Sequence, residues 1–114
     1  MTVQIIGTRK CSNTRKAERF FKERGINFHL VDLRERGLSK GELKNITRKI
    51  DMEDLIDTDC QEYGKRGLEY MIFDPLEKLL EHPLLMKTPV VRYGDRVTIG
   101  YSLEEWKQWL TERS

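Results

Sequence analysis

The first 33 residues alternate between two hydrophobic periodicities, and this alternation constrains the fold more than any other feature of the 114-residue chain. Residues 2–6 form a short apolar run that is typical of a buried strand and ends at Gly7. Between residues 12 and 24, apolar side chains recur at helical spacing, and Gly25 is a typical helix stop. Residues 26–33, INFHLVDL, predict a second strand. Strands joined through a helix pair in parallel by a right-handed crossover, so the chain opens with a βαβ unit.

A helical insertion is predicted over about residues 34–84, because this segment is too long for a single crossover helix. Ser39 and Glu42 have the spacing of a capping box and predict a helix start. The apolar stripe of this helix, which we expect to be about 11 residues long, consists of Leu43, Ile46 and Ile50. A further turn is expected over 52–56, and short helices over 57–73.

A second capped helix closes the insertion. Asp74 followed by Pro75 predicts its start, and His82 and Pro83 predict its end. Its inner face is predicted to consist of Leu76, Leu79 and Leu80.

The last part of the chain predicts a β-hairpin and a final helix. Strand-forming residues at 88–92 and 96–100 flank a turn over 93–95. Ser102 and Glu105 fit a capping box, and the inner face of the helix should consist of Leu103, Trp106 and Leu110. This order predicts one α/β domain over residues 1–114 with a thioredoxin-like (glutaredoxin-like) fold, in which helices cover both faces of a mixed four-stranded sheet.

Composition and charge exclude several classes of protein. Twenty-one Lys and Arg against nineteen Asp and Glu give a net charge of +2, far below the excess typical of nucleic-acid binding, so no direct nucleic-acid contact is expected. Apolar runs are much shorter than the roughly 20 residues of a membrane span, and the N-terminus lacks the pattern of a secretory signal, so a cytoplasmic location is expected. The two cysteines lie 49 positions apart, and His29 and His82 have no ligand-spaced partners. Reduced thiols, no metal and no bound cofactor are therefore expected.

Cys11 is the residue best placed to carry chemistry. It follows the first predicted strand and precedes the first helix, whose initial turn has free backbone N–H groups and a partial positive charge. Four basic residues flank it: Arg9, Lys10, Arg15 and Lys16. Cations and a helix N-terminus both lower the pKa of a cysteine and favour the reactive thiolate. A small buried structural cysteine is the alternative interpretation.

The run over residues 10–17, KCSNTRKA, is similar to the arsenate reductase (ArsC) and Spx family of thioredoxin-fold proteins. The resemblance includes the H-P-L-L-x-K-x-P stretch over 82–89 and the G-Y-S start of the last helix, and it spans nearly the whole chain. It implies that Cys11 is the family's reactive cysteine. It also implies that Pro89 is a cis-proline beside it, which would expose the backbone of Thr88 to a thiol peptide or glutathione. A trans proline that opens an edge strand is the alternative.

The chain departs from the family pattern at several positions. Spx-type regulators carry a second cysteine three positions after the first, where this chain has Thr14, so no local C-x-x-C pair can form. Arsenate reductases hold their oxyanion with three arginines, and the matching positions here are Asp59, Thr88 and Ile99. An arsenate clamp is not expected, because a dianion needs charge-assisted, bidentate partners. The cations that would have to compensate are Lys87, Arg92 and Arg96.

The resemblance implies a thiol-dependent oxidoreductase in which the Cys11 thiolate attacks a disulfide or glutathionylated substrate, with glutathione as co-substrate. The residues expected to stabilise the charge or orient the incoming chain are Lys10, Thr14, Arg15, Lys16, Lys87, Thr88 and Pro89. Cys60 is expected to act as a resolving thiol if the insertion brings it near Cys11, whereas resolution by glutathione and an inert Cys60 are the alternatives. Two other functions stay open: a Spx-like module that binds RNA polymerase or another protein, and an arsenate reductase that uses glutathione and glutaredoxin.

Overall fold

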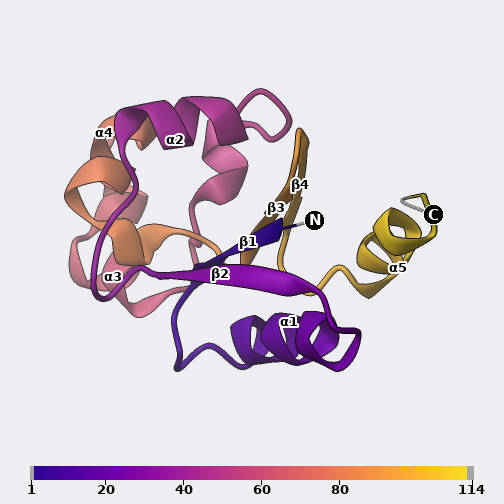
Figure 1. Ribbon diagram of the computed structural model, residues 1–114. Helices are drawn as coiled ribbons and strands as arrows, with labels where there is room; N and C mark the ends of the chain where they lie inside the picture. The colour runs from indigo at the N-terminus through magenta and orange to yellow at the C-terminus, as the bar shows by residue number, and fades with distance from the viewer. Residues whose placement is uncertain (1, 113–114) are drawn as a thin grey trace.

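A mixed sheet separates two layers of helices (Figure 1). The computed structural model describes residues 2–112. Strands β1 (Thr2–Gly7) and β2 (Asn27–Asp32) run parallel. On its other edge, β1 pairs antiparallel with β3 (Val90–Tyr93), which forms an antiparallel hairpin with β4 (Arg96–Ile99). The resulting strand order, β2-β1-β3-β4, confirms the predicted thioredoxin-like sheet.

Two helices, α1 (Ser12–Glu23) and α5 (Leu103–Glu112), cover one face of the sheet (Figure 1). Their core contains Val3, Ile5, Ala17, Phe20, Phe21, Ile26, Val91, Trp106 and Trp109. Within it, the indole N–H of Trp106 donates to Oγ1 of Thr98 at 2.9 Å, so its buried polar atom is satisfied. This core holds α1 against the strand that leads into it.

The end of α1 is fixed by a glycine, as predicted. The amides of Gly25 and Ile26 donate to the carbonyls of Lys22 and Phe21 at 3.1 and 2.9 Å, which is a Schellman motif. Gly25 has a φ of 67°, a conformation that glycine adopts without the steric cost of a Cβ atom. The chain thereby turns directly into β2.

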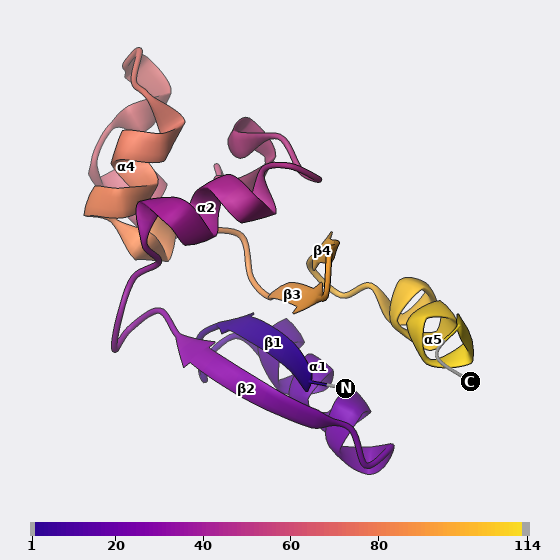
Figure 2. The same ribbon diagram turned by 45° about the horizontal axis from the view of Figure 1, so that its top comes forward.

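The insertion covers the opposite face of the sheet (Figures 1 and 2). Its elements are α2 (Lys40–Ile46), η1 (Met52–Leu55), α3 (Gln61–Lys65), η2 (Leu68–Tyr70), α4 (Pro75–Glu81) and η3 (Pro83–Leu85). Ile6, Val31 and Val90 of the strands pack against the apolar side chains of these elements. Successive strand residues point to opposite faces, so Ile5 and Ile6 belong to different cores.

The first helix of the insertion is shorter than predicted. The capping box at Ser39 is present, with Ser39 Oγ accepting from the Glu42 amide at 3.1 Å and the Glu42 carboxylate accepting from the Ser39 amide at 2.9 Å. The helix ends at Ile46 after seven residues, not about 11. Ile50 nevertheless packs against the core, because irregular turns continue past the helix and the amides of Lys49 and Ile50 both donate to the carbonyl of Ile46, at 3.1 and 3.2 Å.

Two further local predictions are wrong. Leu80 is 38% exposed, whereas its neighbour Leu79 is buried, because consecutive helical residues point in directions about 100° apart. The hydroxyl of Ser102 donates to the carbonyls of Ile99 and Gly100 at 3.2 and 3.3 Å. It therefore ties the start of α5 to the end of β4 instead of completing the expected capping box.

Candidate functional site: a thiol at the head of the first helix

The thiol of Cys11 lies where β1 passes into α1. After Gly7 the chain turns, and the amide of Cys11 donates to the carbonyl of Thr8 at 3.1 Å. Cys11 has an extended backbone and immediately precedes the first helical turn. Its side chain is half-buried, so the sulfur is partly shielded from water and still accessible to a reactant.

Thr88 is the direct hydrogen-bond partner of the thiol. Its Oγ1 donates to Cys11 Sγ at 3.1 Å, and its carbonyl oxygen lies 3.8 Å from the same sulfur. The peptide bond between Thr88 and Pro89 is cis, as the resemblance implied. The two residues are 77 positions apart in the sequence. They meet because β3, which follows Pro89, pairs with β1, which precedes Cys11.

Uncharged donors lower the pKa of Cys11. Partial burial raises the pKa of the thiol, but the hydroxyls of Thr14 and Thr88 and the backbone amides of Thr14 and Asn13 more than offset this, so the pKa lies below its ordinary value. The two amides belong to the first turn of α1 and act on the sulfur without reaching the geometry of a capping hydrogen bond. Because the thiolate is the nucleophilic form of cysteine, the site favours the reactive species.

Two of the basic residues that flank the thiol in the sequence contact other groups in the structure. Arg15 donates to the carbonyl of Arg9 at 3.1 Å. The ammonium of Lys16 lies over the ring of Tyr101, 5.3 Å from its centroid. Arg9 and Lys10 are exposed. The hydroxyl and amide donors described above act directly on the sulfur, whereas a role of the four cations in holding the thiolate stays a prediction.

Thr14 is buried in the first turn of α1, and its hydroxyl has no hydrogen-bond partner of standard geometry within residues 2–112. It lies so close to Gly7 that a Cβ atom at that position would be 2.3 Å from Thr14 Oγ1. Glycine therefore allows the end of β1 to approach the helix. With no competing partner, this hydroxyl is available to the Cys11 sulfur, whose pKa it lowers.

A cavity of about 570 Å³ opens beside the thiol. Its walls include Cys11, Asn13, Asp54, Asp57, Lys87 and Thr88. The insertion reaches the cavity through an isolated antiparallel bridge between Ile56 and Met86. In this bridge the amide of Asp57 donates to the carbonyl of Leu85 at 2.8 Å, and the amide of Lys87 donates to the carbonyl of Leu55 at 2.7 Å. The bridge brings carboxylates of the insertion to the thiol.

Sequence reasoning missed three residues that line this cavity: Asn13, Asp54 and Asp57. Asn13 had a usable signal, because it belongs to the helical turn whose amides face the thiol. The two aspartates had none, since their position depends on a bridge that no periodicity of the sequence indicates. Their carboxylates face a cavity to which Lys87 contributes a cation.

The cavity is poorly suited to an oxyanion. Thr88 and Ile99 line it with uncharged side chains. They occupy two of the positions at which arsenate reductases of the family are expected to have arginine. The two arginines that would have to compensate have other partners: Arg92 donates to Gln4, and Arg96 pairs with Glu112. An arsenate ion would therefore meet one lysine and two carboxylates in place of the bidentate cationic partners that it needs.

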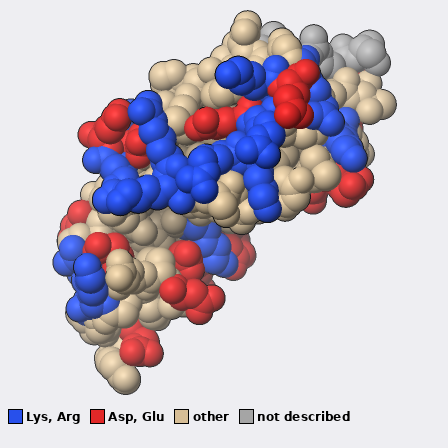
Figure 3. Space-filling view, turned by 90° about the horizontal axis from the view of Figure 1, so that it is seen from below, with Lys and Arg blue, Asp and Glu red and all other residues tan. Residues whose placement is uncertain are grey.

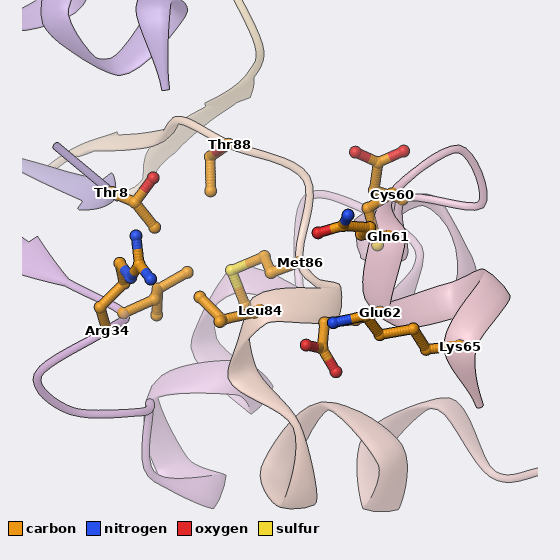
Figure 4. A pocket seen from close by; sticks show the side chains of 11 residues that line it. Thr8, Arg34, Cys60, Gln61, Glu62, Lys65, Leu84, Met86 and Thr88 are labelled. Atoms are coloured by element: carbon orange, nitrogen blue, oxygen red, sulfur yellow. The ribbon is translucent and has the colours of Figure 1, made fainter. Parts of the chain in front are cut away.

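Cys60 lines a second cavity that adjoins the first. This cavity measures about 380 Å³ and shares Asp57 and Thr88 with the thiol cavity. Figure 4 shows Cys60, at the start of α3, across the cavity from Thr8 and Arg34. Both cysteines are free and half-buried. The two thiols open onto adjoining cavities, and a bond between them stays a prediction.

Neither histidine lines either of these two cavities. His29 is exposed on β2, and His82 follows α4 with its Nε2 3.6 Å from the carboxylate of Glu81. Over residues 2–112, no three or more His, Cys, Asp or Glu side chains are grouped in a way that would hold a metal ion. Within the same residues, every helix is too short or too polar to cross a membrane.

The fold and this site define a thioredoxin-like protein with one cysteine at the head of its first helix and a threonine before a cis-proline. The sequence model of the ArsC family matches residues 6–109, so the chain belongs to the ArsC family. Global transcriptional regulator Spx 2 of Oceanobacillus iheyensis is 32% identical over 120 aligned positions, which cover 100% of this chain and 87% of that protein. The YusI protein of Bacillus subtilis is 26% identical over 106 positions, which cover 87% of this chain and 90% of that one.

Solved structures share the fold. The arsenate reductase from Vibrio cholerae superposes with a TM-score of 0.81 at 21% identity, covering 95% of this chain and 97% of that one. The YffB (PA3664) protein superposes with a TM-score of 0.83 at 17% identity, covering 93% and 96%. The family match over residues 6–109, together with the 32% identity to Spx 2, confirms the resemblance to the ArsC and Spx family.

Proposed function

We propose that the protein is a thiol-dependent oxidoreductase whose nucleophile is Cys11. The observation that carries the proposal is the hydrogen bond of 3.1 Å from Thr88 Oγ1 to Cys11 Sγ at the wall of an open cavity. The lowered pKa of this thiol supports it, because thiolates attack disulfides. The cytoplasm, where glutathione keeps thiols reduced, is the compartment that suits this chemistry.

The reaction proceeds by thiol–disulfide exchange. The Cys11 thiolate attacks the glutathione sulfur of a glutathionylated substrate, the substrate S–S bond breaks, and the substrate sulfur leaves as a thiolate that takes a proton from water. Cys11 is then bonded to glutathione. A second glutathione thiolate attacks this mixed disulfide, releases oxidised glutathione and restores the Cys11 thiolate. The substrate thiol is regenerated, and the glutathionyl group removed from it leaves joined to one free glutathione as a single molecule of oxidised glutathione.

The residues around the sulfur have distinct roles in this reaction. Thr88 and Thr14 stabilise the thiolate through their hydroxyls, as the pKa of Cys11 indicates. Lys87 lines the thiol cavity and offers a cation to a carboxylate of glutathione or of a peptide. Pro89, directly after Thr88, places the backbone of that residue beside the incoming chain.

Mass spectrometry of trapped intermediates tests the proposal. The protein is mixed with a glutathionylated peptide without free glutathione, and the adduct is located after digestion. We expect glutathione on Cys11 and a stoichiometric release of peptide thiol. Cys11→Ser should give neither product. Wild-type protein that releases no peptide thiol would refute the proposal.

The same experiment distinguishes the two resolving thiols. If Cys60 resolves the intermediate, the adduct on Cys11 converts to an intramolecular disulfide and glutathione is released. The adduct then accumulates only in Cys60→Ser. If glutathione resolves it, the adduct is equally stable in wild-type protein and in Cys60→Ser until glutathione is added.

A second candidate function is a regulatory module that binds RNA polymerase. The observation that favours it is the 32% identity to a protein named global transcriptional regulator Spx 2 across this entire chain. A module of this kind needs its surface but not its thiol. Purified RNA polymerase should then bind wild-type protein and Cys11→Ser with the same affinity, and the absence of such binding would eliminate this candidate.

A further inference from the structure

Charge is segregated along α1 and the loop before it. Residues 8–24 contain seven Lys and Arg and two Glu, a local net charge of +5, whereas the rest of the chain has fourteen Lys and Arg against seventeen Asp and Glu, a net charge of −3. All seven basic side chains are exposed. Figure 3 views the molecule from below, the side on which α1 lies in Figure 1, and shows Lys and Arg in a band across this face. We call these seven residues the basic face.

Most of the basic face has no counter-ion among the residues that the structure describes. Arg9 lies 3.8 Å from the carboxylate of Asp32. Six others form no ion pair within residues 2–112: Lys10, Arg15, Lys16, Arg19, Lys22 and Arg24. The thiol does not need them either, because uncharged groups account for its lowered pKa. Exposed like charges repel one another, so such a face is stabilised by an anionic partner.

A shallow groove of about 320 Å³ lies within the basic face. Lys16, Arg19 and Arg24 line it together with Glu23 and Tyr101. Tyr101 is 48% exposed. The groove thus combines three cations and one carboxylate with an aromatic surface, and its excess of positive charge suits a polypeptide segment that carries carboxylates.

The opposite side of the thiol is acidic. Residues 51–62, which include η1 and the start of α3, contain six carboxylates and no Lys or Arg. Asp54 and Asp57 of this segment line the thiol cavity together with Cys11 and Asn13. The thiol therefore lies at the boundary between a positive and a negative surface.

We propose that the basic face docks an acidic segment of the protein whose disulfide Cys11 attacks, an inference that rests on the function proposed above. Attraction between the segment and α1 brings the disulfide to the thiol and increases the rate of productive encounter. Nucleic acid fits this surface less well. A long polyanion along α1 would meet the carboxylates of residues 51–62, and the whole chain has a net charge of only +2.

Three peptides of equal length test the charge preference. Each has one cysteine linked by a disulfide to 2-thiopyridine, and the flanking residues are Glu, Gln or Lys. The Cys11 thiolate attacks the peptide sulfur, thiopyridone leaves and absorbs light, and a Cys11–peptide disulfide forms; Cys60→Ser protein isolates the reaction at Cys11. At low ionic strength we expect the Glu peptide to react fastest and the Lys peptide slowest, with at least about a tenfold difference. This difference should largely disappear at 1 M salt, where the Debye length is about 3 Å.

Two charge-matched double variants locate the effect. Arg19→Glu with Lys22→Glu should abolish the preference for the Glu peptide. Arg48→Glu with Lys49→Glu changes the net charge equally at exposed positions just after α2 and should retain it. The neutral disulfide 2,2′-dithiodipyridine serves as the reference substrate for every variant.

The outcomes separate this inference from the proposed function. If dithiodipyridine reacts and the three peptides do not differ, the docking inference is wrong and the oxidoreductase proposal stands. Equal effects of both double variants would also overturn it, because net charge alone would then explain the preference. If a DNA duplex binds and the Glu peptide gains no rate, the surface is a nucleic-acid site. If dithiodipyridine fails to react at Cys11, the oxidoreductase proposal itself fails.

Discussion

Replacing Thr88 by valine isolates the hydrogen bond on which the candidate site depends. Thr88→Val keeps the shape of the side chain but removes the hydroxyl that donates to Cys11 Sγ at 3.1 Å. The other groups that lower the pKa of the thiol, including the hydroxyl of Thr14, stay in place. We therefore expect the pKa of Cys11 to rise without a change of fold.

The magnitude follows from the strength of a hydrogen bond to a charged group, about 1.5–3 kcal/mol. The thiol is half-buried and keeps its other donors, so we use the lower limit, which corresponds to a rise of about one pKa unit. Below both pKa values the thiolate fraction then falls about tenfold. The remaining thiolate becomes about threefold more nucleophilic, because thiolate reactivity increases with pKa with a Brønsted slope of about 0.4–0.5. The net rate should fall about threefold at low pH and rise about threefold at high pH.

The assay is the rate of exchange with 2,2′-dithiodipyridine as a function of pH, in Cys60→Ser protein. The profiles of the parent and of Thr88→Val should cross, which a general loss of structure would not produce. Thr2→Val is the matched control, because Thr2 is exposed at the end of β1 far from Gly7 and the thiol. Profiles that coincide, or that differ by one factor at every pH, would show that Thr88 does not set the pKa of Cys11.

Three further predictions concern stability. Gly7→Ala should lower the free energy of unfolding in urea by about 1–3 kcal/mol, because the new Cβ would lie 2.3 Å from Thr14 Oγ1; an unchanged urea midpoint would contradict the close approach. Ser39→Ala should lower it by about 1 kcal/mol by removing the cap of α2, and Ser39→Asn should restore most of this loss. Because folding lowers the pKa of Cys11, its thiolate stabilises the folded protein relative to Cys11→Ser. This stabilisation is fully present above the unfolded pKa of about 8.5 and is lost as the pH falls through the folded pKa. A pH-independent difference between these two proteins would show that folding does not shift the pKa.

The elements that the sequence predicted correctly are those whose signals are local. The helix at residues 12–23 has its apolar stripe and Gly25, and the helix over 75–81 has Asp74 as its cap, whose side chain accepts from the Leu76 amide. The predicted length of the first insertion helix was wrong, because the apolar stripe continues to Ile50 while the regular helix gives way to irregular turns after Ile46. Hydrophobic periodicity identifies the buried face of a helix, whereas the residue at which the helix ends also depends on tertiary packing.

The groups that lower the pKa of Cys11 could not be identified from its sequence neighbours either. Sequence neighbours of Cys11 suggested that cations activate the thiol, but neighbours along a helix start need not point at the same atom. The groups that act on the sulfur are amides of the helical turn and two hydroxyls, one of them 77 positions away. The pKa of the thiol can therefore be lowered by a set of uncharged donors. The cations of α1 are then available to bind an acidic partner. A substitution of Arg19 should therefore change the preference among peptide substrates without changing the pH profile of the Cys11 thiol.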